Sequence, residues 1–180
     1  MRGKGQEICQ RGNLSPLTSH PSPPPKYIMT INEIQDEVIE EFSDFTDWMD
    51  KYQLLIDLGN DQEPLDERYK TEQNLIDGCQ SRVWLVADYR DGLLSFTAES
   101  DALIVKGIVA LLIRVLSGHT PQEILDADLY FIDRIGLREH LSPTRSNGLL
   151  AMLKQIKAYA VAYGNLPLAP SQGRGTVDAN

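Results

Sequence analysis

The sequence predicts an α+β fold in which a small antiparallel β-sheet has helices packed on one face. In residues 83–99 apolar and polar side chains alternate, and Arg90-Asp91-Gly92 divides this stretch at a hairpin turn. Segments with the apolar spacing of helices lie on both sides of it. With 180 residues, of which 42% are hydrophobic, the chain suits one domain with a real core.

Two helices are expected before the strands. Thr30 begins a Thr-x-x-Glu capping box, and apolar residues at helical spacing continue to Phe42. Ser43 or Asp44 is expected to cap a second helix, which Gly59 ends. Together the two segments are predicted to form a helical hairpin.

The segment that leads to the strands is polar. Residues 60–74 have no clear apolar period, which predicts a long loop with one helical turn near residues 66–69. Leu75 and Ile76 are expected to form a further short strand of the sheet.

Helices are expected again after the strands. A helix that opens at Ser100 or Asp101 and runs to Leu116 has almost no polar face, so it is predicted to be buried at the centre. Residues 120–123 form another capping box, with proline at the first helical position. Residues 131–141 are expected to be irregular or to form short helices.

The last helix is predicted to open at Ser142-Pro143 and to end at Gly164. Several of its apolar residues are expected to face inward, namely Leu149, Leu150, Leu153, Ile156 and Ala160.

The two ends of the chain are expected to lie outside the domain, which we place at residues 29–168. Residues 1–28 are rich in Gly, Ser and Pro, so they are predicted to be disordered or an upstream extension of the protein. Residues 169–180 are predicted to be a flexible tail.

Charge and cysteine content narrow the range of functions. The net charge of −9 is the sum of +3 on residues 1–28 and −12 on the rest of the chain. An acidic body repels phosphate backbones, so nucleic acid is not an expected partner. No apolar window reaches the length of a membrane span, so no membrane association is expected. Two cysteines and three scattered histidines predict neither a disulfide framework nor a metal site, and they fit a cytoplasmic protein.

Cys79 is the candidate functional residue. It follows Asp77-Gly78, a pair that favours a turn, and a thiol on a loop is placed to meet a partner. Gly78 gives the backbone freedom and removes side-chain bulk beside the sulfur. A thiolate can attack a disulfide or a persulfide, bind a metal or become acylated. The alternative is that Cys79 is a small buried apolar side chain, which is common for cysteine.

The run from Asn74 to Trp84, which contains Gly-Cys-Gln-Ser-x-Val-Trp, closely resembles the cysteine motif of the SufE family. These proteins are sulfur acceptors that partner a cysteine desulfurase. The likeness continues in the family's order through three further segments, which are Ser100 to Gly107, Thr120 to Ile124 and Leu141 to Leu149. The resemblance implies an α+β fold shared with the IscU-type scaffolds.

The resemblance also implies a reaction. The Cys79 thiolate attacks the outer sulfur of a desulfurase persulfide, becomes a persulfide itself, stimulates the desulfurase and passes the sulfur to iron–sulfur cluster assembly. Because the loop has one cysteine without companions, this chain is expected to carry sulfur and not to hold a cluster. It is expected to be a carrier with relay activity rather than a stand-alone enzyme.

The implied partners are a SufS-type cysteine desulfurase, of the SUF or the CSD system, and a downstream Fe–S scaffold complex. No cofactor is expected in this chain, since pyridoxal phosphate belongs to the desulfurase. The chain is expected to be a monomer or a weak dimer.

Other residues are candidates for supporting roles. Arg145 matches an arginine of the family's Ser-Pro-x-Arg segment; it either stabilises the sulfur or contacts the desulfurase, or it is an exposed cation at a helix start. Asp101 either takes part in partner binding or loop closure, or is a helix N-terminal acid. Gln80 and Ser81 either donate hydrogen bonds near the sulfur or end the turn. Lys106 either approaches the thiol or extends to solvent.

Two other functions stay open at this point. His140 could be the base of a cysteine hydrolase that uses Cys79 as its nucleophile, although no third, orienting residue is evident. The chain could also be a non-catalytic binding module in which Cys79 only fills space.

Overall fold

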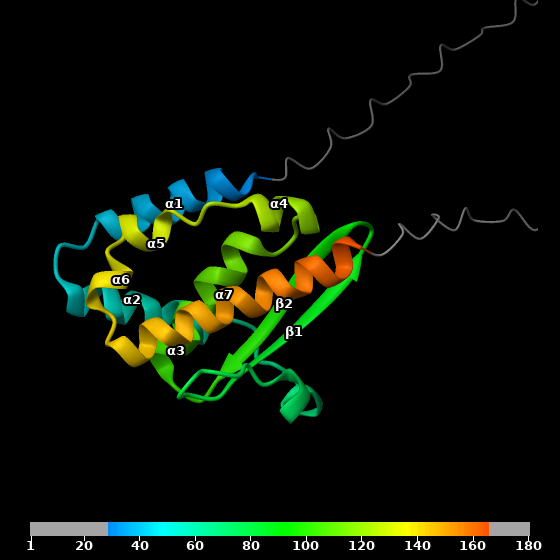
Figure 1. Ribbon diagram of the computed structural model, residues 1–180. Helices are drawn as coiled ribbons and strands as arrows, with labels where there is room; N and C mark the ends of the chain where they lie inside the picture. Colours follow the sequence, from blue (N-terminus) through cyan, green and yellow to red (C-terminus); the bar gives the residue numbers. More distant parts are fainter. Residues whose placement is uncertain (1–28, 166–180) are drawn as a thin grey trace, which may run out of the picture.

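The computed structural model describes residues 29–165, in which helices lie on one side of a long β-hairpin (Figure 1). The predictions for residues 1–28 and 169–180 lie outside the described residues. The elements are α1 (Ile31–Ser43), α2 (Trp48–Asp61), the 3₁₀ helices η1 (Glu67–Tyr69) and η2 (Glu72–Asn74), β1 (Val83–Arg90), β2 (Leu93–Ser100), α3 (Leu103–Leu116), α4 (Pro121–Asp126), α5 (Phe131–Arg134), α6 (Leu137–His140) and α7 (Pro143–Gly164).

The β-hairpin confirms the alternating pattern. Its strands pair antiparallel from Val83 opposite Ser100 to Arg90 opposite Leu93. Asp91 and Gly92 both have positive φ, at 52° and 84°, as a two-residue turn of the mirror-image type requires. The side chains that β2 turns toward the helices are buried, including those of Leu94, Phe96 and Ala98.

The sheet of residues 29–165 has two strands, so the prediction of a further strand at Leu75 and Ile76 is wrong. Leu75 forms an isolated bridge with Trp84, and the Ile76 amide donates to the Val83 carbonyl at 2.8 Å. The chain then turns away from β1, and the pairing stops after these contacts.

Helix α3 is buried at the centre, as its sequence predicts. It contacts α1, α2, α7 and β2. It begins at Leu103, later than the prediction of Ser100 or Asp101. Ser100 is still paired with Val83 in the hairpin, which delays the start of the helix.

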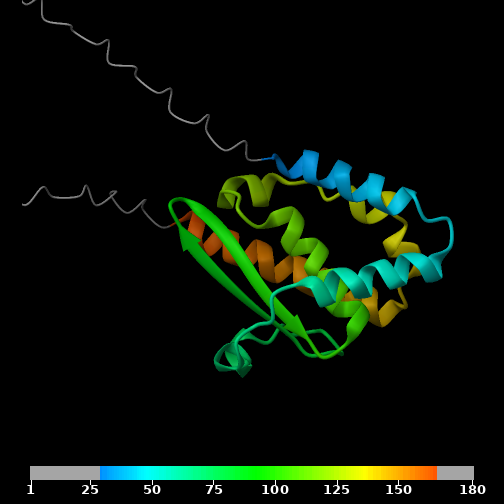
Figure 2. The ribbon, with the colours of Figure 1, turned by 180° about the vertical axis from the view of Figure 1, so that it is seen from behind.

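The predicted capping box of Thr30 and Glu33 is present at the N-terminus of α1. Helix α2 is capped by Asp47, so the prediction of Ser43 or Asp44 is wrong. The two helices run in opposite directions and are joined by residues 44–47, as the predicted helical hairpin requires (Figure 2). Their main contacts are with other elements, because α1 packs on α3 and α5 while α2 packs on α3.

Gly59 does not end α2, which continues to Asp61. It lies instead where α2 crosses α3: a Cβ at Gly59 would be 2.8 Å from the Gly107 nitrogen, and a Cβ at Gly107 would overlap the Leu55 carbonyl. The two glycines therefore allow the backbones of the two helices to approach closely.

The C-terminal half follows its predicted order. The capping box of Thr120 and Glu123 is present at α4, residues 131–141 contain two short helices, and α7 begins at Pro143. Leu150 is 54% exposed, so its prediction as inward-facing is wrong, because α7 turns an adjacent stripe of side chains inward. That buried stripe comprises Leu149, Met152, Ile156 and Ala160.

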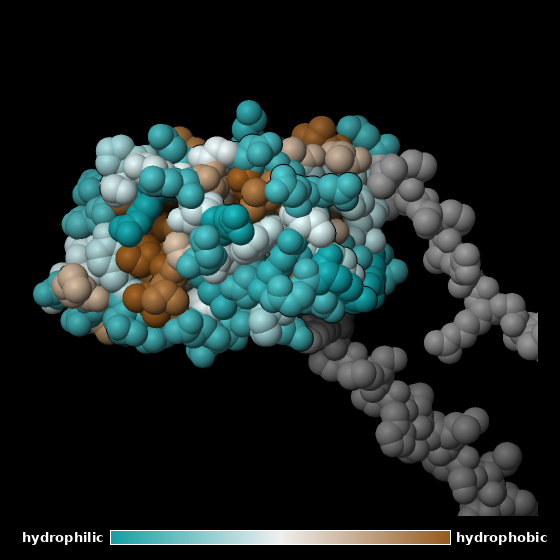
Figure 3. Space-filling view, turned by 90° about the horizontal axis from the view of Figure 1, so that it is seen from below, coloured by the Kyte–Doolittle hydropathy of each residue, from teal (hydrophilic) through white to brown (hydrophobic). Residues whose placement is uncertain are grey.

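The surface seen in Figure 3 is mostly polar, with small separate apolar patches. No helix within residues 29–165 combines the length and the apolar character needed to cross a bilayer.

The crossing of α2 and α3 is open to a direct test. We expect Gly107→Ala to lower the free energy of unfolding by about 3 kcal/mol, because the methyl group meets the backbone of α2. Gly118→Ala is the matched control, since a Cβ there meets no atom within 4 Å and carries only the cost, about 1 kcal/mol, of its φ of +82°. Urea unfolding measures both, and equal losses would contradict this account of the crossing.

Candidate functional site

The candidate site is the loop of residues 77–81, which connects Ile76, beside the start of β1, to Arg82, just before β1. At its first end, Ile76 is buried and its amide donates to the Val83 carbonyl. The loop therefore starts from a fixed point beside β1.

The second end of the loop is held through the backbone of Arg82. Its amide donates to Asp101 Oδ1 at 3.0 Å. Its carbonyl accepts from Ser100 Oγ at 2.9 Å and from the Asp101 amide at 3.3 Å. Of the roles considered for Asp101, the structure supports loop closure: the carboxylate ties the loop to the turn before α3 and does not line the pocket described below.

Between these ends the chain turns sharply at Gly78. This residue has a φ of +87°, a conformation that suits glycine and strains other residues. The predicted use of its backbone freedom is confirmed. The turn directs Cys79 toward α7, where its Sγ donates to the Gly148 carbonyl at 3.5 Å.

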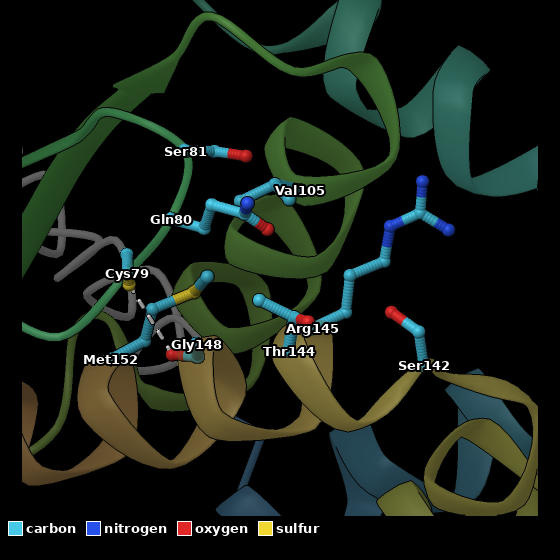
Figure 4. A pocket seen from close by; sticks show the side chains of 9 residues that line it. All are labelled: Cys79, Gln80, Ser81, Val105, Ser142, Thr144, Arg145, Gly148 and Met152. Carbon is cyan, nitrogen blue, oxygen red and sulfur yellow. Dashed lines mark hydrogen bonds between the residues drawn. The ribbon is translucent and has the colours of Figure 1, made fainter.

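A pocket of about 370 Å³ lies beside the sulfur, between the loop, the start of α3 and the first turns of α7 (Figure 4). The side chain of Cys79 is half-buried against it. The lining residues are Cys79, Gln80, Ser81, Val105, Ser142, Thr144, Arg145, Gly148 and Met152.

Burial raises the pKa of the Cys79 thiol, since the thiolate would lose contact with water. No cation among residues 29–165 offsets this effect. The resting site therefore holds a protonated thiol that donates a weak hydrogen bond.

Arg145 lines the same pocket, as its motif suggested, but does not reach the sulfur. Figure 4 shows its guanidinium group directed away from Cys79. Its side chain is exposed and forms no ion pair or hydrogen bond with any residue from 29 to 165. A cation without a partner in that part of the chain is available to a partner outside it.

Gln80 and Ser81 also line the pocket, one exposed and one half-buried. Their side chains form no hydrogen bond within the described part of the chain. The prediction that they donate hydrogen bonds near the sulfur is therefore not met in this state, in which they end the turn.

Lys106 occupies neither position considered for it. Its Nζ lies 2.9 Å from Glu99 Oε1, and the two side chains are 18% and 10% exposed. Burial by itself raises the pKa of Glu99, but the hydrogen bonds from Lys106 and the Ser100 amide, together with the positive charges of Lys106 and Lys70, outweigh it and lower that pKa. Lys106 is a partly buried ion-pair partner that neither lines the Cys79 pocket nor extends freely to solvent.

His140 is absent from the residues that line the Cys79 pocket. Its ring stacks on Trp48 with centroids 3.8 Å apart, and its Nδ1 lies 3.0 Å from the Gly136 carbonyl oxygen. The hydrolase alternative therefore loses its proposed base.

Sequence reasoning missed the wall of the pocket opposite Cys79. Gly148 and Met152 stand on α7, one turn apart, and Val105 stands on the first turn of α3. A glycine within a helix was the available signal for Gly148, because glycine is disfavoured there unless space is needed. Within residues 29–165, no three His, Cys, Asp or Glu side chains are arranged to hold a metal ion.

Comparisons with known proteins agree on one family. The SufE model, described as an Fe-S metabolism associated domain, matches residues 36–160. An uncharacterised SufE-like protein of Rhizobium meliloti (strain 1021) is 42% identical, with 73% of this chain and 96% of that protein covered. An uncharacterised SufE-like protein of Synechocystis sp. (strain ATCC 27184 / PCC 6803 / Kazusa) is 38% identical, with 77% and 86% covered.

A solved structure supports the fold independently. The solution structure of a hypothetical protein from Thermus thermophilus matches with a TM-score of 0.60 at 24% identity, covering 72% of this chain and 94% of that chain. The family match, the curated relatives and the fold agree with the cysteine motif read from the sequence. The chain belongs to the SufE family and has a role in Fe–S metabolism.

Proposed function

We propose that the protein accepts sulfane sulfur from a cysteine desulfurase as a persulfide on Cys79 and passes it to iron–sulfur cluster assembly. The observation that carries the proposal is the position of Cys79, on a five-residue loop between two fixed ends and beside a pocket. Such a loop can present one sulfur atom to a partner without unfolding the domain around it.

The transfer is a thiol–persulfide exchange. Cys79 first loses its proton, and its thiolate attacks the outer sulfur of the desulfurase persulfide. A new S–S bond forms at Cys79 while the S–S bond of the donor breaks, and the donor cysteine leaves as a thiolate. No electrons enter or leave the pair of proteins.

The resting site leaves part of this chemistry to the partner. Cys79 is half-buried, its pKa is raised by burial, and its thiol donates to Gly148. We infer that the loop of residues 77–81 moves from this tucked form to an extended form in which the desulfurase can deprotonate and reach the sulfur. Arg145, with no partner in the described chain, is proposed to contact the desulfurase.

The donor is a SufS-type desulfurase whose pyridoxal phosphate makes the first persulfide, and the protein stimulates that enzyme by removing its sulfur. The acceptor is an Fe–S scaffold complex. The protein is proposed to act in the cytoplasm as a monomer or weak dimer.

Persulfide formation is the direct test of this function. The other cysteine of the chain, Cys9, is replaced by serine so that Cys79 is the only thiol. In this Cys9→Ser background, incubation with desulfurase, pyridoxal phosphate and cysteine is expected to add the mass of one sulfur atom to the peptide that contains Cys79. The control variant is Cys79→Ser, which lacks the thiol. No mass gain, or an equal gain in the control, would exclude the proposed function.

The pH dependence of alkylation tests the protonated resting state. Because burial raises the pKa of Cys79, alkylation of the folded Cys9→Ser protein should reach its half-maximal rate at a higher pH than in urea. The raised pKa of Cys79 also affects the free energy of unfolding. Its stabilising contribution is fully present below the pKa of cysteine in the unfolded chain, about 8.5, and is lost as the pH rises through the higher pKa of Cys79 in the folded chain. A midpoint equal to or below that of the unfolded chain would contradict the account.

Arg145→Ala tests the contact with the desulfurase. We expect sulfur uptake to slow by about tenfold, the effect of losing about 1.4 kcal/mol at an interface. The free energy of unfolding should stay unchanged, since the guanidinium has no partner within residues 29–165. Lys154→Ala, an exposed cation on α7 outside the pocket, is the matched control. Equal uptake by the two variants would remove Arg145 from the interface.

A further inference from the structure

Gly148 faces the Cys79 sulfur from the second turn of α7. A Cβ built on it would lie 3.6 Å from Cys79 Sγ and 4.0 Å from Met152 Cε. Both distances are ordinary van der Waals contacts. The thiol form of the protein therefore has room for alanine at this position.

The resting structure does not explain why this residue is glycine. Gly148 has no positive φ, so its backbone does not require glycine. Within a helix, glycine costs about 1 kcal/mol relative to alanine. This differs from Gly107, where an added Cβ would overlap the backbone of α2.

A second sulfur atom changes the requirement. An S–S bond is about 2 Å long. An outer sulfur on Cys79 that points toward a methyl group 3.6 Å from Sγ would come well inside van der Waals distance of it. With glycine at this position, the pocket of about 370 Å³ is open to the added atom.

We propose that Gly148 is a positioning residue that leaves space for the outer sulfur of the Cys79 persulfide, so that the loaded loop can return to the tucked form. The inference rests on the proposed function and deepens it. Persulfide formation replaces the hydrogen that Sγ donates to the Gly148 carbonyl, so the loaded state depends on space rather than on that hydrogen bond. In the tucked form, Val105 and Met152 shield the outer sulfur from small thiols.

The test loads the sulfur chemically, so that it does not depend on a desulfurase. Full-length chains in a Cys9→Ser background are treated with sodium polysulfide and desalted, and the loss of the outer sulfur to glutathione is followed by mass spectrometry. Gly148→Ala is expected to lose it about tenfold faster than the wild-type residue, which corresponds to about 1.4 kcal/mol.

Asn147→Ala is the matched control. Asn147 is exposed on the same turn and does not line the pocket, so this change raises helix propensity without altering the space beside the sulfur. Its persulfide should last as long as that of the wild-type chain. Equal lifetimes in all three chains would overturn the proposal.

Thermal unfolding separates lost space from lost stability. As thiols, Gly148→Ala and Asn147→Ala should be at least as stable as the wild-type chain, and loading should lower the Tm of Gly148→Ala alone. A less stable Gly148→Ala thiol form, or an equal change in Tm on loading in all chains, would overturn the assignment. A chain that shelters a chemically made persulfide but receives no sulfur from a desulfurase would exclude the proposed function and leave the role of Gly148 intact.

Discussion

Burial of α3 is the constraint on which the structure depends. The helix contacts β2, α1, α2 and α7, and its place against α2 is set by the close approach of Gly59 and Gly107. Its first turn carries Val105 into the Cys79 pocket, while the turn before it carries Asp101, which holds the backbone of Arg82. The packing of one apolar helix thus fixes both a wall of the pocket and one end of the loop.

The chemistry of the site supports the proposed sulfur-carrier function over the cysteine hydrolase alternative. Burial raises the pKa of Cys79, and no side chain of the described residues opposes that effect. Arg145 points away from the sulfur, and His140 stacks on Trp48 elsewhere. An enzyme of the hydrolase type needs its base beside the nucleophile. A sulfur carrier benefits from having no base beside its cysteine. While no partner is bound, the thiol then stays protonated and does not exchange with other disulfides.

Much of the fold could be predicted from local patterns. The capping boxes, the hairpin and the loop position of Cys79 depend on residues close in sequence, and these predictions are confirmed. The predicted cap of α2 is a local error, and the larger errors concern tertiary neighbours. Gly59 looks like a helix stop but lies against α3, and Lys106 looks solvated but pairs with Glu99. Gly148 is 69 residues from Cys79, and no short-range pattern indicates that the two meet.

The loop of residues 77–81 is fixed at both ends, and we propose that it moves between them. Native-state amide hydrogen exchange tests it residue by residue. The amides of Ile76 and Arg82 donate to Val83 and Asp101, whereas those of residues 77–81 donate no hydrogen bond to a described residue. The account predicts slow exchange at Ile76 and Arg82 and fast exchange between them. Equal protection across residues 76–82, or fast exchange at the two ends, would contradict it.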